Sequence, residues 1–422
     1  MTTNRTTGGT PDGPTWALVR VLRDPNAGLL LAGVVVSGFG TSALWLASGI
    51  WVKDLTGSDG LAALCLLAMW APTLAGPLLG TLSDRVRRKP LLIGTSLLMA
   101  ALLLTLVTVD SPQTLWLLFT VLFVYGAAGV VNDAAESALA ATAVDRSLLG
   151  DLGGLRMTAT EGMKLLAPLA GAGLYTAHGG AAVAFLDAVT FAGAAVLYLF
   201  LQVREERPAP PAPGRRGQTA EGIRFLRSHP ALRPLVLAGG ATMLCAGLNG
   251  ALVYAVVDGL GHSPAYSGVL YAVQGAGSVV LGLCAGPALR RLGERRFAAY
   301  GIVLLAGGVA LRAVPSDPVA WACSAAIGAG LPALLIAALT AVQRETPGPL
   351  LGRVTATANT LVFTPNVIGL AAGAALVELI DHRPVLAALG LALLVPAARL
   401  FQSAASAERT DSRSSSDAKP AW

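Results

Sequence analysis

The sequence predicts an all-α membrane protein with twelve transmembrane helices in two pseudo-symmetric six-helix bundles. Apolar residues make up 54% of the 422 residues and charged residues 13%, whereas a soluble domain carries about 25% charge. Many stretches also exceed the ~20 apolar residues that cross a bilayer. These runs are too many and too long for the core of a large soluble protein. A basic loop that recurs near half the chain length indicates two related halves.

The apolar runs place the twelve spans at residues 28–50, 62–82, 90–109, 114–134, 154–176, 180–201, 234–257, 265–288, 297–314, 318–341, 354–380 and 385–402. The predicted domains are a cytoplasmic N-terminal tail (1–25), an N-terminal bundle (26–203), a cytoplasmic central loop (204–233), a C-terminal bundle (234–402) and a disordered cytoplasmic tail (403–422). In the central loop, residues 221–227 form either a plain connector or a short amphipathic helix at the membrane surface.

Two basic loops relate the halves. Residues 80–89, GTLSDRVRRK, join the second and third spans, and residues 286–296, GPALRRLGERR, lie 206 positions later between two other apolar runs. Arg85 of the first loop matches Arg291 of the second. Similar halves of this kind are typical of transporters built by duplication.

The basic residues also predict the orientation of the chain. With both termini in the cytoplasm, twenty-six of the 30 Lys and Arg residues fall on the cytoplasmic side, and only Lys53, Arg312 and Arg383 fall outside. Lys164 falls within a span. This asymmetry follows the positive-inside rule, so the net charge of +6 reports topology and gives no indication of a nucleic-acid partner. The excess of Arg over Lys, with abundant Ala and Gly, points to a GC-rich bacterial genome and hence to a bacterial cytoplasmic membrane.

Several classes of protein are excluded or disfavoured by motifs that the sequence lacks. It has no Gly-x-x-x-x-Gly-Lys-[Ser/Thr] pattern for an ATP-driven pump. Its four His residues have no metal-ligand spacing, and its four Cys residues fall inside spans. A membrane-embedded enzyme would need a cluster of His, Asp or Glu residues, and the sequence shows none. We therefore predict no catalytic residues, no metal site and no cofactor.

The loop at 80–89 resembles the signature Gly-x-Leu-Ala-Asp-Arg-x-Gly-Arg-Lys of the major facilitator superfamily, with Arg87 in place of the second Gly. Segments 51–58, 185–191 and 351–354 resemble the drug:proton antiporter branch that contains macrolide-efflux proteins. The antiporter motif of the fifth span keeps Pro168 and Gly171, while Met163 replaces its first Gly. The resemblance implies a major facilitator fold, a small-molecule substrate and protons as the coupling ion. We expect a monomer embedded in the bilayer.

Three charged residues inside spans are candidates for proton coupling, because an ionisable residue at mid-span costs about 2.5–3.5 kcal/mol on insertion scales. Glu161 and Lys164 lie three residues apart in the fifth span and share a helix face. They form either a static salt bridge or a proton-responsive site. Asp187 in the sixth span has no charged neighbour within a turn. It is either the proton acceptor, because burial favours the neutral carboxyl, or a partner in interhelical hydrogen bonds.

A gating network is implied by the resemblance. In the family, an acid of the fourth span joins the signature Asp and Arg to lock the outward-facing state. The matching residues here are Asp84, Arg88 and Asp133, with Arg85 and Glu136 beside them. The alternative is a solvated surface cluster.

Aromatic and amide side chains supply candidates for the substrate cavity. Phe39, Trp45, Asn249 and Gln274 are the residues we select, and Trp70, Tyr125, Tyr254, Tyr271 and Phe363 add aromatic surface within or near spans. A cavity with apolar walls and few polar groups suits amphipathic molecules. Aromatic residues at span ends are alternatively interfacial anchors.

These observations predict a secondary active transporter that exports hydrophobic or amphipathic, drug-like molecules by proton antiport and alternating access. An importer or facilitator of a polar metabolite is the alternative within transport, and the cavity candidates are poor in charge for it. A membrane-embedded enzyme is the alternative from another class. Antibiotic self-resistance, general drug efflux and siderophore export would all give this sequence pattern.

Overall fold

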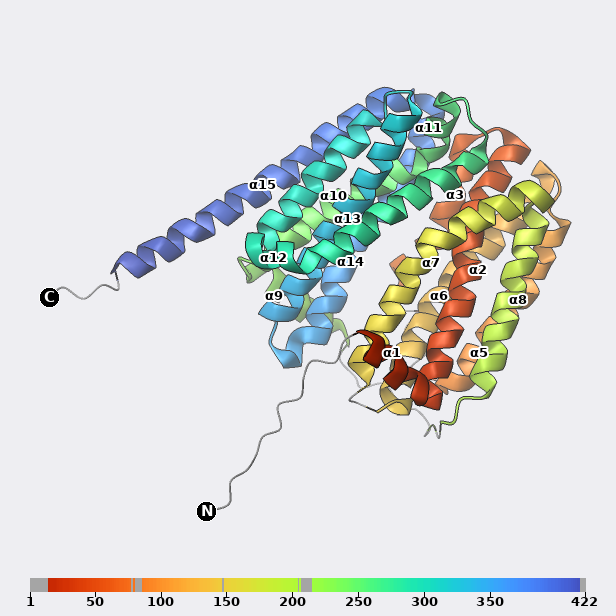
Figure 1. The fold of residues 1–422 in the computed structure, drawn as a ribbon, viewed down its shortest axis with the longest axis horizontal. Helices are drawn as coiled ribbons and strands as arrows, with labels where there is room; N and C mark the ends of the chain where they lie inside the picture. Colours follow the sequence, from red (N-terminus) through yellow and green to blue (C-terminus); the bar gives the residue numbers. More distant parts are fainter. Residues whose placement is uncertain are drawn as a thin grey trace, which may run out of the picture.

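A computed structural model of the chain describes residues 14–76, 79, 86–145, 148–203, 205 and 215–417. These residues form helices and connecting turns, without strands, in two bundles that lie side by side (Figure 1). The all-α architecture of two bundles that the sequence predicts is therefore confirmed.

The first half holds α1 (Pro14–Arg23), α2 (Pro25–Thr56), α3 (Asp59–Trp70), η1 (Ala71–Ala75), α5 (Arg88–Thr105), η2 (Leu106–Thr108), η3 (Pro112–Thr114), α6 (Leu115–Ala143), α7 (Leu149–His178) and α8 (Gly180–Leu199). The second half holds α9 (Arg215–Ser228), α10 (Leu232–Ala251), α11 (Val253–Gly259), η4 (Pro264–Tyr266), α12 (Ser267–Leu311), α13 (Asp317–Glu345), α14 (Gly348–Leu379) and α15 (His382–Asp417).

Nine segments of the described chain are long and apolar enough to cross a membrane. Three features separate this number from the predicted twelve. α12 covers two predicted spans and reverses direction at Gly293, whose φ of 73° favours glycine. α3 with η1 is a shorter apolar segment, and α7 carries four charged residues, among them Glu161 and Lys164. The count of twelve stays a prediction.

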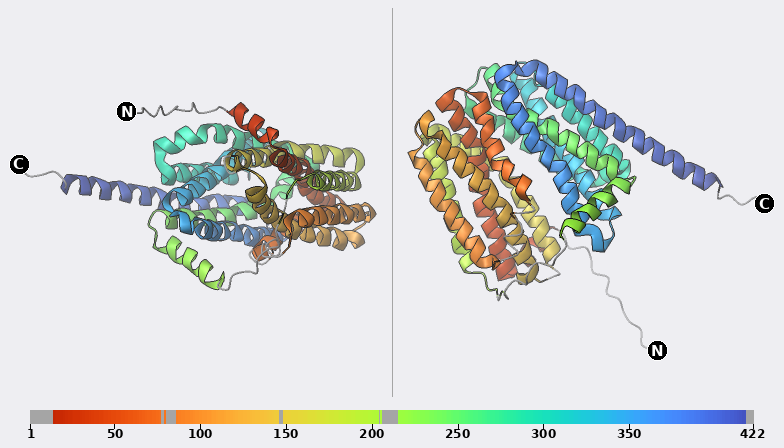
Figure 2. Two further views of the ribbon diagram at one scale, coloured as in Figure 1. Left: turned by 90° about the horizontal axis from the view of Figure 1, so that it is seen from below. Right: turned by 180° about the vertical axis from the view of Figure 1, so that it is seen from behind.

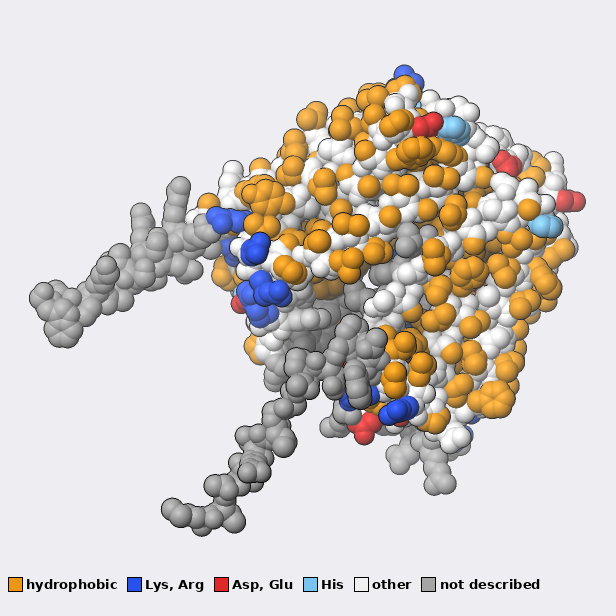
Figure 3. Space-filling model, viewed as in Figure 1, with side chains coloured by type: hydrophobic (Ala, Val, Ile, Leu, Met, Phe, Trp, Pro, Cys, Tyr) orange, Lys and Arg blue, Asp and Glu red, His pale blue; other side chains and the backbone are white. Residues whose placement is uncertain are grey.

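The two ends of the bundles differ in charge. Because successive helices alternate in direction, one end carries Arg88, Lys89, Arg290, Arg291 and Arg295; we call it the basic end. The other end carries Asp59, Asp258, Glu378 and Asp381, and we call it the acidic end. Figure 3 shows apolar side chains covering the flank between them. Exposed residues such as Leu283, at 79% exposure, are the expected surface of a protein that contacts lipid tails.

Helical structure also extends into segments for which the sequence predicts tails and a loop. α1 forms within the predicted N-terminal tail, because Val21 is apolar and packs with Ala27 and Leu30 of α2 in one buried cluster. α9 covers the amphipathic segment 221–227 and contacts α14. α15 continues as a helix to Asp417, beyond the predicted span end at 402, and projects from the bundle in both views (Figures 1 and 2). The domain boundaries themselves stay predictions.

The halves meet along two helix pairs, α3 with α14 and α7 with α12. Their ribbons lie side by side near the acidic end and diverge toward the basic end, as Figure 1 and the right panel of Figure 2 both show. Each half has a main core, and the core of the first half also takes in Val253 and Tyr254 of α11. One cluster includes Leu44, Leu118 and Leu122, and another includes Leu232, Leu334 and Leu386.

Candidate functional site

Asp187 lies in the interior of the first half, on α8, with a side chain that is 0% exposed. Its carboxyl oxygen Oδ2 is 3.0 Å from the hydroxyl of Tyr125 on α6. Its other oxygen, Oδ1, accepts a hydrogen bond of 3.0 Å from Thr190, one turn later on α8. The tyrosine hydroxyl is in turn 2.6 Å from Oγ1 of Thr41 on α2. Three helices therefore converge on one carboxyl group.

The close approach of α2 to this carboxyl depends on Gly40. A Cβ atom at this position would collide with Asp187 Oδ1 and Thr190 Oγ1. The ring of Phe191 packs edge-on against Tyr125 with 5.4 Å between centroids, which fixes the tyrosine from the other side. The partners of Asp187 are thus uncharged and held in place by packing. Such surroundings disfavour a carboxylate and favour its neutral, protonated form.

Of the predicted partner pair on α7, the structure describes only the Lys164 side chain. Lys164 is exposed on α7, and the side chain of Glu161 lies outside the described residues. Their proposed role in coupling therefore stays a prediction.

At the basic end, the structure describes part of the predicted gating network. The guanidinium of Arg88 lies 3.4 Å from the backbone oxygen of Ala138 on α6, and the backbone N–H groups of Arg88 and Lys89 donate to Glu205. Asp133 is exposed on α6. Asp84 and Arg85 lie outside the described residues. A joint network of Asp84, Arg88 and Asp133 stays a prediction.

Glu136 has partners that the sequence alone does not identify. Its side chain is buried, forms an ion pair of 2.6 Å with Arg156 on α7, and accepts a hydrogen bond of 2.5 Å from the hydroxyl of Tyr198 on α8. This cluster ties α6, α7 and α8 together within the first half. Glu136 itself is therefore buried and paired, while the choice between a gating network and a solvated cluster for Asp84, Arg88 and Asp133 stays open.

The acidic end holds charged contacts between the halves. Lys53 of α2 is buried and forms ion pairs of 2.7 Å with Asp59 of α3 and with Asp258 of α11. Glu378 of α14 accepts hydrogen bonds from the Ser58 hydroxyl (2.6 Å) and the backbone N–H of Gly60 (2.7 Å), at the start of α3. A carboxylate is stabilised at a helix N-terminus by the exposed N–H groups and the helix dipole.

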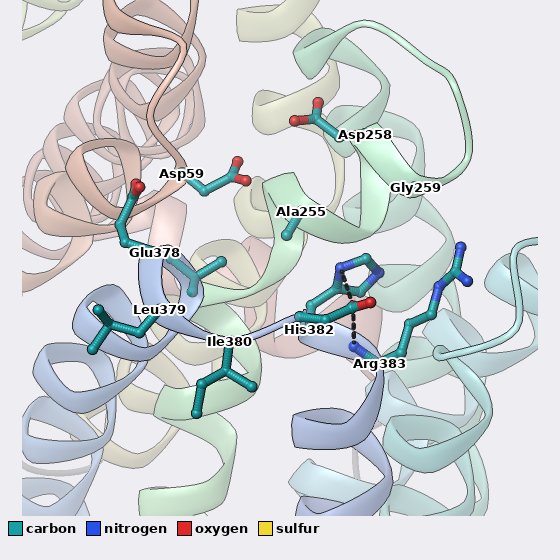
Figure 4. A pocket seen from close by; sticks show the side chains of 11 residues that line it. Asp59, Ala255, Asp258, Gly259, Glu378, Leu379, Ile380, His382 and Arg383 are labelled. Atoms are coloured by element: carbon teal, nitrogen blue, oxygen red, sulfur yellow. Dashed lines mark hydrogen bonds and ion pairs between the residues drawn. The ribbon is translucent and has the colours of Figure 1, made fainter.

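A surface pocket of about 560 Å³ opens beside these contacts. Figure 4 shows Asp59 lying between Glu378 and Asp258, with His382 and Arg383 on the other side of the pocket. The pocket therefore lies on the seam where the two halves join.

Aromatic side chains lie beneath this charged layer. Trp45 of α2 meets Tyr271 of α12 edge-on, with 4.8 Å between ring centroids. The hydroxyl of Tyr254 on α11 lies 3.3 Å from the backbone oxygen of Leu46. Phe39, another predicted cavity residue, packs half-buried at the core of the first half. Trp45 is thus a contact between the halves in this structure.

The predicted polar cavity residues of the second half have different surroundings. Asn249 is buried on α10, and its side-chain oxygen accepts a hydrogen bond of 3.3 Å from Arg312. Gln274 is half-buried on α12, where its backbone oxygen accepts from Ser278. Arg312 and Lys53, which are predicted to lie on the outer side of the membrane, are both buried, at 4% and 8% exposure; their side of the membrane stays a prediction. Lys53 is held there by the carboxylates of Asp59 and Asp258, and Arg312 by the side chains of Asn249 and Ser324.

Most partners in these clusters come from distant parts of the sequence. From the sequence, Tyr125 stands out only as an aromatic side chain, and Thr41 and Arg156 carry no functional signal. The spacing of Asp187 and Thr190 was a local signal, because residues three apart share a helix face.

Comparisons with a family model and with a known protein both point to membrane transporters. A model of the Major Facilitator Superfamily matches residues 30–248 and residues 235–421. Macrolide efflux protein A of Streptococcus pyogenes is 25% identical over 213 residues, which are 49% of this chain and 53% of that protein. The match with this relative thus covers about half of its length.

Solved structures with low sequence identity share the fold. The POT family transporter PepTSo has a TM-score of 0.72 at 13% identity, covering 94% of this chain and 99% of that one. A bacterial homologue of the iron transporter ferroportin, in an inward-facing state, has a TM-score of 0.68 at 15% identity, covering 91% and 99%. The nucleoside transporter NupG has a TM-score of 0.67 at 12% identity, covering 89% and 98%.

Proposed function

Because the chain belongs to the Major Facilitator Superfamily and is a multi-pass membrane transporter, not an enzyme, we propose that it exports amphipathic, drug-like molecules in exchange for protons. The observation that carries the proposal is Asp187, a fully buried carboxyl group with uncharged partners in a membrane-spanning helix. A carboxyl group in such surroundings can exist there in its neutral form and release a proton when its surroundings become more polar.

The orientation in the membrane is part of the proposal. The basic end faces the cytoplasm of a bacterial cell by the positive-inside rule, and both termini lie on that side. The contacts of Lys53, Glu378 and Trp45 then close the outer end of the transporter. An outer end closed by these contacts, together with halves that diverge toward the basic end, supports an inward-facing arrangement (Figure 1). Breaking these contacts would accompany the change to the outward-facing arrangement.

The substrate class rests on two further observations. The chain resembles a macrolide efflux protein over about half of its length. The residues where the halves meet include Trp45, Tyr254 and Tyr271, which offer aromatic surface once the halves separate. Aromatic and aliphatic walls with few polar groups suit molecules of mixed polarity. The transporter acts as a monomer in this proposal.

A transport assay tests the proposal directly. Everted membrane vesicles from an efflux-deficient bacterium that expresses the chain should accumulate a radiolabelled macrolide when the interior is acidified. A protonophore should abolish this accumulation, and vesicles without the protein give the background. Uptake driven by the substrate gradient alone, unaffected by the protonophore, would exclude proton antiport. If a wide panel of amphipathic drugs is not transported while nucleosides or peptides are, the alternative of a polar-metabolite carrier is correct.

A further inference from the structure

We propose that Tyr125 and Thr41 form a hydroxyl relay through which Asp187 exchanges its proton, an inference that rests on the proton antiport proposed above. Three consecutive oxygen pairs define the relay. The Oδ2 atom of Asp187 is 3.0 Å from the Tyr125 hydroxyl, which is 2.6 Å from Oγ1 of Thr41. This Oγ1 atom is 2.8 Å from the backbone oxygen of Ser37.

The number of hydrogens in this row of hydrogen-bonded groups identifies the protonation state of Asp187 in which every oxygen pair shares a hydrogen. Each oxygen pair needs one hydrogen, and a hydroxyl supplies one. Tyr125 and Thr41 together supply two for three pairs, and the backbone oxygen of Ser37 supplies none. The third hydrogen can come only from the carboxyl group of Asp187. Thr190 does not change the count, because its hydroxyl lies beside the other carboxyl oxygen and the backbone oxygen of residue 187.

The charged form of Asp187 requires the opposite direction of hydrogen bonding. Tyr125 then donates to the carboxylate, Thr41 donates to Tyr125, and the backbone oxygen of Ser37 loses its bond from Thr41. The same four groups therefore have two arrangements, one for each protonation state of Asp187. Hydrogen bonds in a buried chain reinforce one another, so the two arrangements switch as a unit.

Burial gives the relay a direction. Asp187 is fully buried and Tyr125 is 5% exposed, whereas Thr41 and Ser37 on α2 are partly exposed. The hydroxyl chain therefore leads from the core of the first half toward accessible atoms of α2. On deprotonation, the proton of Asp187 passes to Tyr125, the proton of Tyr125 passes to Thr41, and the proton of Thr41 passes to water. The net products are a carboxylate and a hydronium ion.

No charged group of the described residues interferes with this exchange. The groups that interact electrostatically with Asp187 are Tyr125, from α6, and Thr190, from its own helix. α2, α5 and α7 also pack against α8. Their charged residues lie elsewhere. Lys53 and Asp54 are at the acidic end of α2, and Arg88 and Lys89 are at the basic end of α5. On α7, Arg156 is paired with Glu136 of α6, Asp151 lies in the first turn, Lys164 is exposed, and the Glu161 side chain is outside the described residues. Tyr125 is thus the titratable side chain that faces Asp187 in the described structure.

Infrared spectroscopy tests the relay without knowledge of the substrate. The carbonyl stretch of protonated Asp187 is assigned as the carboxylic-acid band present in the wild type and absent in Asp187→Asn. Transfer of the membranes into D₂O shifts this band as the proton exchanges. Tyr125→Phe and Thr41→Val should each slow the exchange about tenfold or more, since positioned groups accelerate proton transfer by ~10²–10⁴-fold. Thr41→Ser keeps the hydroxyl and should exchange at the wild-type rate.

The same variants separate failure of the relay from failure of the proposed function. Tyr125→Phe keeps the ring that packs on Phe191, and Thr41→Val keeps the side-chain shape, so loss of either protein from the membrane is not expected. Wild-type exchange in both variants would overturn the relay while leaving Asp187 as a proton site. Wild-type proton-driven transport by Asp187→Asn would instead overturn the coupling role of Asp187. Slow exchange in Thr41→Val but not in Thr41→Ser would support the relay even if Tyr125→Phe did not fold.

Discussion

Asp187 in the first half and Arg312 in the second half are both buried among uncharged partners, yet they differ in what burial can do to them. Asp187 contacts the hydroxyls of Tyr125 and Thr190. Arg312 is held by Asn249 and Ser324, and its Nε atom is buried without a hydrogen-bond partner. A carboxyl group can lose its charge by binding a proton, whereas a guanidinium group stays charged. The comparison suggests a titratable site in one half and a fixed charge in the other.

The geometry around the two residues supports this distinction. Asp187 has a chain of hydroxyl groups leading toward partly exposed atoms of α2. Arg312 connects α12 to α10 and α13 through two neutral hydrogen bonds of 3.3 Å, and no carboxylate within the described chain contacts it. We therefore expect substitutions at Asp187 to change transport and substitutions around Arg312 to change stability.

The largest effect should come from Asp187→Asn. The amide keeps the shape of the carboxyl group but cannot bind or release the proton, so proton-driven export should fall about 100-fold, within the range that positioned acid–base groups supply. Initial rates of macrolide uptake into acidified everted vesicles measure it. Asp187→Glu, which restores a carboxyl group, should recover part of the rate. If Asp187→Asn retained more than half of the wild-type rate, Asp187 would not be the titratable site that distinguishes the first half from the second.

The next effect concerns Asn249. Asn249→Ala removes a hydrogen-bond acceptor from a buried guanidinium, which should lower the free energy of unfolding by about 1–3 kcal/mol. Thermal melts of the detergent-solubilised protein would show it as a lower Tm. In an Arg312→Met background, the same substitution should cost less, because the buried charge is already gone. Equal costs in both backgrounds would mean that Asn249 does not stabilise Arg312.

A smaller effect is expected at the acidic end. Glu378→Gln weakens the hydrogen bonds to Ser58 and Gly60 that join the halves. A change of about 1 kcal/mol would alter the ratio of closed to open outer ends about fivefold. Distance distributions between spin labels on exposed positions of α3 and α14 measure this ratio. The matched control is Asp381→Asn. Asp381 lines the same pocket, but its carboxylate accepts a hydrogen bond from the backbone N–H of Arg383 within the second half. Equal distributions for Glu378→Gln and wild type would contradict a closing role.

The smallest effect should come from Arg312→Met. Replacing a buried charge with an apolar side chain of similar length is often neutral or stabilising, and no carboxylate of the described chain is left unpaired by it. We expect a Tm within the error of the wild type or above it, and proton-driven export above half of the wild-type rate. Loss of export with an unchanged Tm would show that the fixed charge takes part in transport.

The sequence was sufficient for the membrane fold because span length and the distribution of basic residues are properties of local segments. It was also sufficient to select Asp187, since an isolated acid in an apolar run stands out. It was not sufficient for Tyr125 and Thr41, because these residues meet Asp187 only through the packing of α2, α6 and α8. The burial of Lys53 and Arg312 between helices could not be predicted for the same reason. Loop position follows from the sequence, but burial between helices depends on how those helices pack.

Proton release on substrate binding tests the central claim most directly. In an antiporter, substrate and proton favour different states, so binding of one lowers the affinity for the other. Adding a macrolide to the purified wild-type protein in weakly buffered solution near neutral pH should release up to about one proton per bound molecule. Asp187→Asn should bind the macrolide and release none. Equal proton release by Asp187→Asn and wild type, with equal binding, would contradict the assignment of Asp187 as the proton site.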